Sequence, residues 1–327
     1  LPRGIAPAAL AALAGDRRMG PGARMTRPEA IERSGLAPDV FDTYSTALGC
    51  VPIEGAPPGE VGYTDDEVRA LGSVGLLSEM FSPEAAKGLI RVIGSSMARI
   101  GVAGVSLFLS DIESPHMLSG AKEIDLAHSV YDAVGLLDGM AAGLDPVLRR
   151  QMLQAVERTR RTSIDITERF QYRYAIGFVD LVGFTARSSG MGAQELSRFM
   201  GRFEGEAHDV ATSAGARVVK LIGDEVMFIA VDPQDACACV RALMQQFEGR
   251  RIDPRGGLAY GELLTRGGDY YGSIVNLASR IGDLAVPREV LATPALAERC
   301  PDYSFEPAGR RQLKGFDDPV SLVSLAL

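Results

Sequence analysis

Two apolar segments that each lead into an aspartate constrain most strongly what this chain can fold into. Residues 175–179 form a short apolar run that ends at Asp180, and a polar segment able to start a helix follows it. Two further apolar runs flank Gly223-Asp224, a pattern typical of a tight hairpin turn. We therefore expect a central strand that ends at Asp180, beside a hairpin with Asp224 at its tip. Two such carboxylates offer the oxygen ligands that a hard divalent cation prefers.

The rest of the C-terminal half alternates helical and strand patterns. We expect helices over residues 193–214, 233–247 and 275–284, and strands over residues 256–260, near Val290 and near Val320, in addition to the hairpin at 217–231. This order predicts helices packed against a mostly antiparallel sheet, which is an α+β sandwich.

The N-terminal half shows helical spacing and no strand pattern. Thr26-Arg27-Pro28-Glu29 reads as a capping box with Pro in the first turn, and Gly35 to Pro38 separates that helix from the next. Further helices are expected over residues 64–79, 82–112, 122–142 and 145–162. The domain boundaries that follow are a helical domain at 1–156, a linker at 157–173 and a second domain at 174–327.

The ends of the helical half need separate consideration. Residues 1–22 are broken by three prolines, and we interpret them as a flexible end with one short helix rather than a secretion signal. The linker mixes five arginines with acids, which indicates a solvated helix; a segment that switches between helix and coil is the alternative.

An apolar stretch from Val92 to Leu109 exceeds what a thin helical bundle needs. Because it contains Arg99 and several Gly and Ser residues, we expect a buried helix rather than a membrane span. The excess apolar surface predicts a dimer interface in addition to a core. A cavity for a lipid or another apolar ligand between the helices is the alternative.

Charge and composition argue against nucleic-acid binding. The net charge is −8 and Trp is absent, whereas a nucleic-acid surface is usually basic and often aromatic. Residues 27–48 do read as helix, turn and helix, but the second helix carries Asp39 and Asp42 and no Lys or Arg. The spacing of the four cysteines fits neither a zinc site nor a disulfide framework. We therefore expect a cytoplasmic protein without a nucleic-acid partner, and membrane association is left open.

Four motifs, in order, resemble the catalytic domain of class III nucleotidyl cyclases. They are F-x-D-x-x-G-F-T at 178–185, K-x-I-G-D at 220–224, D-x-x-G-x-x-V-N-x-A-S-R at 269–280 and L-K-G at 313–315. The resemblance implies a ferredoxin-like core and adenylyl cyclase activity. The first half resembles, more loosely, the regulatory domain of soluble mycobacterial pH-sensing adenylyl cyclases, through its run of helices and T-R-P-E-A-I at 26–31. That likeness implies a domain that dimerises, inhibits the catalytic half and responds to pH, and a fatty-acid ligand is known for some members.

The resemblance also implies a role for individual residues. Asp180 and Asp224 would hold two Mg²⁺ or Mn²⁺ ions. Lys220 and Asp269 would read the base, and a Lys donor with an Asp acceptor matches adenine, so the substrate would be ATP. The remaining members of the predicted site bind the ribose, the transition state and the phosphates, namely Asn276, Arg280, Lys314, Phe184 and Thr185.

The resemblance implies a site built across a homodimer, with the metal-binding aspartates from one chain and the base-reading and transition-state residues from the other. This chain carries both sets, so a homodimer could hold two equivalent sites. It departs from some relatives at Glu262, where they carry an arginine near the triphosphate; either Arg266 substitutes or the contact is missing. His116 and His128 are candidates for a pH response. The alternative function is a ligand-sensing regulatory protein whose cyclase-like domain is inactive.

Overall fold

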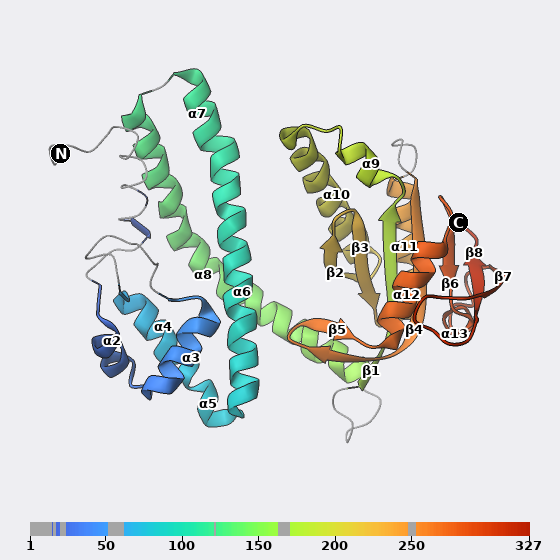
Figure 1. Ribbon diagram of the computed structural model, residues 1–327, viewed down its shortest axis with the longest axis horizontal. Coiled ribbons are helices and arrows are strands. Elements are labelled where there is room, and N and C mark those ends of the chain that lie inside the picture. The colour runs from blue at the N-terminus through green and yellow to red at the C-terminus, as the bar shows by residue number, and fades with distance from the viewer. Residues whose placement is uncertain are drawn as a thin grey trace. The chain divides into compact units, whose positions relative to one another are not determined.

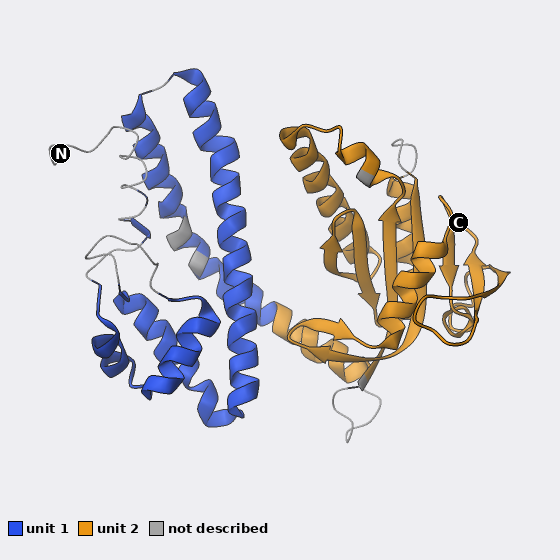
Figure 2. Cartoon of the chain, viewed as in Figure 1, with its two compact units in different colours: residues 1–150 blue, residues 151–327 orange. Residues whose placement is uncertain are grey.

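The computed structural model describes residues 15, 18–19, 24–51, 62–120, 122–162, 171–247 and 253–327, and all structural statements concern these residues. The chain divides into two compact units, Leu1–Arg150 and Gln151–Leu327 (Figure 2). Most of the expected N-terminal end at 1–22 and linker residues 163–170 lie outside the described residues, as does the side chain of Thr185. The domain boundaries at 156 and 173 therefore stay predictions.

Unit 1 is helical, as expected. Its first elements are α2 (Arg27–Ser34), α3 (Pro38–Leu48), α4 (Asp65–Gly75), α5 (Leu77–Met80) and α6 (Pro83–Phe108). The Thr26 amide donates to Glu29 Oε2 at 2.7 Å, and at the start of α4 Thr64 and Glu67 exchange the two bonds of a capping box. These helices enclose a small core that includes the fully buried Phe41.

The second half of unit 1 differs from the expectation. After α6 the helix passes through a π-helical turn, η1 (Leu109–Glu113), into α7 (Ser114–Ser119). The two helices expected at 122–142 and 145–162 are one 40-residue helix, α8 (Glu123–Thr162), with Pro146 inside it. Proline removes one backbone donor from the ladder. On this exposed part of α8, water can satisfy the freed carbonyl, so the helix continues.

The prediction that Val92–Leu109 is buried is wrong for the single chain. Of α6, only Ala86, Ile90 and Gly94 are buried, because α3 and the short α5 pack against its first part. Large apolar side chains in the later part of α6 are exposed, for example Val102 at 68%. The same holds on α8, where Leu153 is 71% exposed. The continuous helix Pro83–Ser119 is long and apolar enough to cross a membrane, by length and composition alone.

Unit 2 is an α+β sandwich, which confirms the predicted fold class (Figure 1). Its sheet has the order β2-β3-β1-β4-β6-β8-β7, and β5 pairs with β4. All neighbours are antiparallel except β4 and β6. The strands are β1 (Gln171–Leu181), β2 (Arg217–Ile222), β3 (Glu225–Ala230), β4 (Pro254–Arg266), β5 (Asp269–Tyr271), β6 (Val290–Ala292), β7 (Phe305–Arg311) and β8 (Val320–Leu325). The helices are α9 (Phe184–Ser188), α10 (Ala193–Ser213), α11 (Pro233–Phe247), α12 (Ser273–Leu284) and α13 (Pro294–Ala297).

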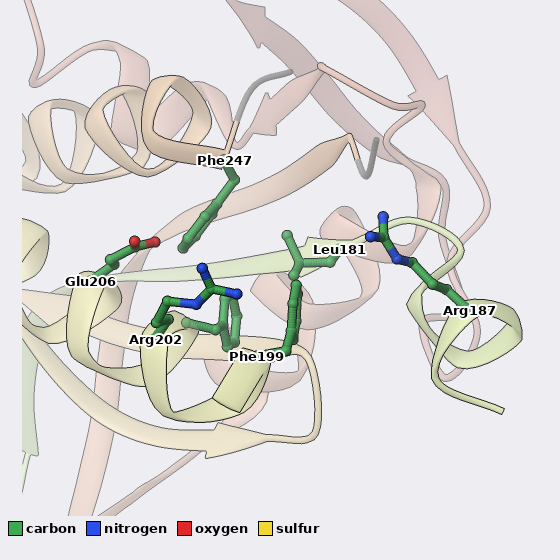
Figure 3. Close-up of a pocket in the computed structure, with 7 residues that line it drawn as sticks. Leu181, Arg187, Phe199, Arg202, Glu206 and Phe247 are labelled. Carbon is green, nitrogen blue, oxygen red and sulfur yellow. The ribbon is translucent and has the colours of Figure 1, made fainter. Parts of the chain in front are cut away.

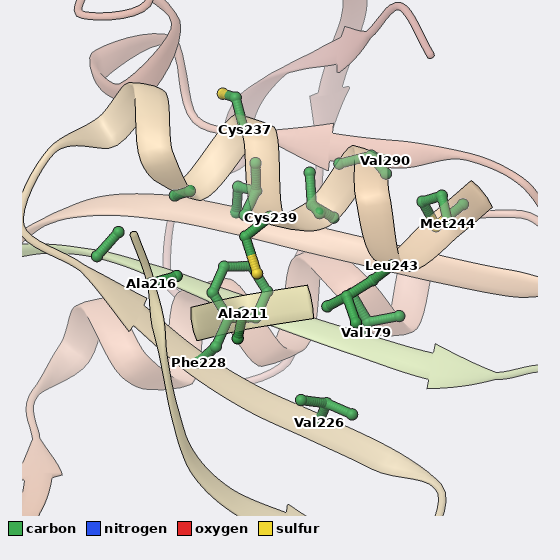
Figure 4. Close-up of a cluster of buried hydrophobic side chains, with 14 of the residues drawn as sticks. Val179, Ala211, Ala216, Val226, Phe228, Cys237, Cys239, Leu243, Met244 and Val290 are labelled. Carbon is green, nitrogen blue, oxygen red and sulfur yellow. The ribbon is translucent and has the colours of Figure 1, made fainter. Parts of the chain in front are cut away.

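Helices cover the two faces of this sheet differently. On the α10–α11 face, side chains such as Val179 and Phe228 join the two helices in the larger core (Figure 4). On the opposite face, Phe178 and Met227 pack with α12, and we refer to this as the α12 face. A Cβ at Gly177 would overlap the Phe228 ring, so the ring occupies the space that glycine leaves.

Candidate active site

Acidic side chains gather where β1 ends and the β2–β3 hairpin turns. Asp180 lies opposite Glu225 of β3 on one side and opposite Arg255 of β4 on the other. Asp224 occupies the tight turn before Glu225. Because side chains alternate along a strand, Asp180 projects to the same α12 face as Phe178.

One arginine neutralises part of this cluster. Arg255 donates from Nε and Nη2 to Asp180 Oδ2 at 3.0 and 2.9 Å, and from Nη1 to the Asp283 carbonyl at 2.7 Å. Both side chains of the ion pair are 24% exposed. The arginine is therefore anchored to the backbone at one end and to the predicted metal ligand at the other.

The pKa values of Asp224 and Glu225 are raised above their ordinary values. Burial raises the pKa of Asp224, and the neighbouring Asp180 adds to this shift. Burial, with the charges of Asp180, Asp283 and Asp224, raises the pKa of Glu225 to about 7, and Arg255 opposes this rise. Acids held together at this cost are chemically suited to a divalent cation, because its charge removes the repulsion.

The donor set fits an ion that also binds substrate. Within the described ranges, no group of three or more His, Cys, Asp or Glu side chains is arranged to hold a metal ion. Asp180 and Asp224 would thus supply only part of a coordination shell. Mg²⁺ is commonly held in this way, by one or two carboxylates together with water and phosphate oxygens.

The two predicted base-reading residues are in contact. Lys220 Nζ lies 2.7 Å from Asp269 Oδ2, and the two side chains are 39% and 31% exposed. The Tyr270 amide donates to Asp269 Oδ1 at 2.9 Å. Burial acts to raise the pKa of Asp269, but the hydrogen bonds from Lys220 and the Tyr270 amide, with the Lys220 charge, outweigh it and leave that pKa below its ordinary value.

Helix α12 presents the other two predicted catalytic residues to solvent. Asn276 and Arg280 are four residues apart, so they share one face of the helix, and both are exposed. Arg280 Nη1 donates to Asp283 Oδ2 at 2.9 Å. Neither side chain has a hydrogen bond with Asp180 or Asp224 among the described residues.

The predicted phosphate-binding residues come from two separate segments of unit 2. Lys314 is exposed in the turn between β7 and β8. The Phe184 side chain is buried and stacks on Phe199, with ring centroids 5.1 Å apart, so only its backbone can contact a substrate. The side chain of Thr185 lies outside the described residues.

Glu262, the departure noted from the sequence, turns away from the site. It lies opposite Arg173, whose Nη2 donates to Glu262 Oε1 at 2.7 Å. Its neighbour Leu263 packs on the α12 face, so Glu262 projects to the other side of the sheet. The acid is thus paired with Arg173 and projects to the face of the sheet opposite Leu263.

The sequence interpretation missed Arg255 and Glu225. Arg255 meets Asp180 through strand pairing across 75 positions, which no local pattern reveals. Glu225 directly follows Asp224, so the acidic pair at the hairpin tip was a usable signal.

A cavity of about 380 Å³ lies on the other side of the sheet (Figure 3). Apolar side chains of β1, α10 and α11 line it together with three charged ones: Leu181, Phe199, Phe203, Phe247, Arg187, Arg202 and Glu206. It contains none of the predicted site residues. The candidate active site is therefore the open α12 face and not this cavity.

Adenylate cyclases are among the relatives of this chain. No protein-family model matches the chain. It is 30% identical over 283 residues to an adenylate cyclase of Streptomyces coelicolor, covering 84% of this chain and 71% of that protein. It is 26% identical over 317 residues to the pH-sensitive adenylate cyclase of Mycobacterium tuberculosis (strain CDC 1551), covering 92% and 78%. Among solved structures, the adenylyl cyclase CyaB from P. aeruginosa aligns at 21% identity with a TM-score of 0.45, over 48% of this chain and 95% of that one.

Proposed function

This chain belongs to the adenylate cyclase family, of class III by its motifs, and on that premise we propose that it converts ATP to 3′,5′-cyclic AMP and pyrophosphate. One observation supports this most directly: the fold brings Lys220 into contact with Asp269, and it places Asp224, in the turn between β2 and β3, beside Asp180 at the end of β1. A nucleotide needs a reader for its base and charge compensation for its phosphates, and these two groups offer both.

Base selection follows from donors and acceptors. The Lys220 ammonium donates and the Asp269 carboxylate accepts, which matches N1 and the 6-amino group of adenine. Guanine presents the reverse pattern at that edge. In the absence of nucleotide the two side chains satisfy each other, and the base would replace that mutual contact.

Asp180 and Asp224 would hold two Mg²⁺ or Mn²⁺ ions. When bound, such ions favour loss of the ribose 3′-hydroxyl proton and neutralise the triphosphate. Arg255 is the cation that the chain itself places among these acids. A guanidinium binds phosphate oxygens in the same forked geometry as carboxylate, so the triphosphate would compete with Asp180 for Arg255. Lys314 is a further candidate for the terminal phosphates.

The exposed face of α12 supports a site shared between two copies. Asn276 and Arg280 are exposed to solvent in a single chain, and among the described residues neither side chain has a hydrogen bond with Asp180 or Asp224. We propose a homodimer in which Asp180 and Asp224 of one copy meet Lys220, Asp269, Asn276 and Arg280 of the other. Asn276 would orient the ribose and Arg280 would stabilise the phosphate charge. Two equivalent sites result.

We further propose that unit 1 regulates this activity. Its exposed apolar helices suit a dimer contact, with an apolar ligand such as a fatty acid as the other occupant. A relative named as pH-sensitive supports acidity as the signal. Autoinhibition and a cytoplasmic location are parts of the same proposal.

The experiment measures cyclic nucleotide made by the purified chain with Mn²⁺, given ATP or GTP. We expect cyclic AMP from ATP, and almost none from Asp224→Ala or from Arg280→Ala. Mixing these two variants should restore up to about a quarter of the activity, since half the dimers are mixed and each holds one complete site. Failure to restore activity would contradict the shared site. No product from either nucleotide would favour the alternative, an inactive cyclase-like module.

A further inference from the structure

Strand β2 contains an irregularity next to the base-reading lysine. Arg217 pairs with Ile229 and Val218 with Phe228, but the next partner, Met227, pairs with Lys220. Val219 is therefore an extra residue, as in a β-bulge.

Because of the bulge, Arg217 and Lys220 project to the same face of the sheet. In a regular strand, residues three apart point to opposite faces. Here both stand opposite residues of the α12 face, Ile229 and Met227, so both side chains project to that face. The extra residue thus gives β2 two neighbouring cations on the side that carries the predicted site.

These two cations contact two consecutive residues of β5. Lys220 pairs with Asp269, as described above. Arg217 Nη2 donates to the Tyr270 hydroxyl at 2.7 Å, with the guanidinium 5.6 Å from the ring centroid. The Tyr270 amide in turn donates to Asp269 Oδ1. The Lys220–Asp269 and Arg217–Tyr270 contacts therefore both join β2 to β5.

Strand β5 depends on such contacts because its backbone is weakly held. It has three residues, and within the described chain it pairs only with β4. The preceding turn is Gly267-Gly268, with φ of 60° and 80°, conformations that glycine adopts freely. Tyr270 is the buried residue of β5 and also packs edge-on against Tyr174 at 5.6 Å.

We propose that Arg217 and Tyr270 are positioning residues for purine selection, which rests on the proposed function. When adenine accepts a hydrogen bond from Lys220 and donates one to Asp269, the Lys220–Asp269 contact between β2 and β5 is lost. The Arg217–Tyr270 contact then keeps β5 in place. The Tyr270 amide holds Asp269 Oδ1, which leaves Oδ2 directed to the 6-amino group.

The test compares Tyr270→Phe, which removes only the hydroxyl, with Tyr271→Phe. Tyr271 is the next residue, is half exposed and lies outside these contacts, so the control makes the same chemical change. For each full-length variant, kcat and KM are measured with ATP and with GTP. We expect the ATP:GTP ratio of kcat/KM to fall about tenfold in Tyr270→Phe, mainly through KM for ATP, and to stay at the wild-type value in Tyr271→Phe.

A second pair of variants tests whether the two residues act together. Arg217→Met should reproduce the Tyr270→Phe ratio, and the double variant should be no worse than either single one, because each removes the same contact. An unchanged ratio in Tyr270→Phe overturns the proposal. Equal losses with ATP and GTP also overturn it, because a merely structural role would affect both.

A binding measurement separates this proposal from the proposed function. Affinities for fluorescent ATP and GTP analogues are measured by titration on the same variants. If the wild type makes no cyclic nucleotide, the proposed activity fails, and the ratio of the two dissociation constants still decides whether Arg217 and Tyr270 select the purine.

Discussion

The two faces of the sheet in unit 2 are built from the same strands and serve different ends. On β1, Val179 is buried between the sheet and its two long helices, whereas the next residue, Asp180, belongs to the acidic cluster. On β3, Phe228 fills the larger core and Met227 packs under α12. Because side chains alternate along a strand, odd and even positions separate residues that fill the larger core from residues of the proposed active site.

The largest effect is expected on the α12 face. Asp224→Asn should lower cyclic AMP formation by about a thousandfold or more, because a metal ion contributes several kcal/mol to the transition state. The folded metal-free variant should be at least as stable as the wild type, since the substitution removes repulsion from Asp180. Activity with Mn²⁺ and urea unfolding in EDTA measure the two quantities. Asp209→Asn, at an exposed position of α10, is the matched control; a large loss of stability in Asp224→Asn would contradict this division of roles.

The next effect is expected on the α10–α11 face and concerns stability. Phe228→Ala should lower the free energy of unfolding by about 3–5 kcal/mol, because it leaves a cavity in the larger core. The ATP:GTP preference of the molecules that remain folded should not change. Met227→Leu, at the adjacent position, should cost less than about 1.5 kcal/mol. A changed purine preference in Phe228→Ala would show that the two faces are coupled.

A small effect is expected at Glu262. Glu262→Gln should change KM for ATP by less than about twofold and stability by less than about 1 kcal/mol, because Glu262 and Arg173 form a half-exposed ion pair on the α10–α11 face. Steady-state kinetics and urea unfolding measure both. A marked fall in KM would instead place this acid beside the triphosphate.

No effect is expected when the purine preference is followed against pH. The folded pKa of Asp269 lies below the ordinary value of 3.8. Its stabilising contact with Lys220 is therefore complete above that ordinary pKa and is lost only as pH falls through the lower folded value. The ATP:GTP ratio of kcat/KM should stay constant from about pH 5.5 to 8. A ratio that drifts in this range would mean that another titrating group acts on the base-reading pair.

The sequence predicted the elements whose signals are local. Apolar runs around Gly223-Asp224 indicated the hairpin, and the family resemblance implied the Lys220–Asp269 pair that the structure brings into contact. Register decided the rest: the partner of Asp180, the direction of Glu262 and the bulge at Val219 all depend on strand pairing between distant segments. The polar, exposed β7 was not anticipated for a related reason, since it has no apolar run.

Unit 1 shows where local patterns mislead. Asp145-Pro146 has the composition of a helix start, yet α8 runs through it. The apolar stretch at Val92–Leu109 is typical of a core helix, yet in the single chain it is exposed. An apolar stretch indicates that its side chains favour burial. It does not indicate whether another part of the same chain or a separate molecule buries them.

The ring of Phe228 over Gly177 also constrains how this protein can evolve. A larger residue at position 177 would collide with the Phe228 ring. In any line of descent that enlarges residue 177, the first substitution must therefore put a smaller side chain at position 228. That intermediate carries a cavity until residue 177 enlarges to fill it. Related sequences should therefore vary at these two positions together, with small beside large in either arrangement, and the order of the two substitutions should be fixed.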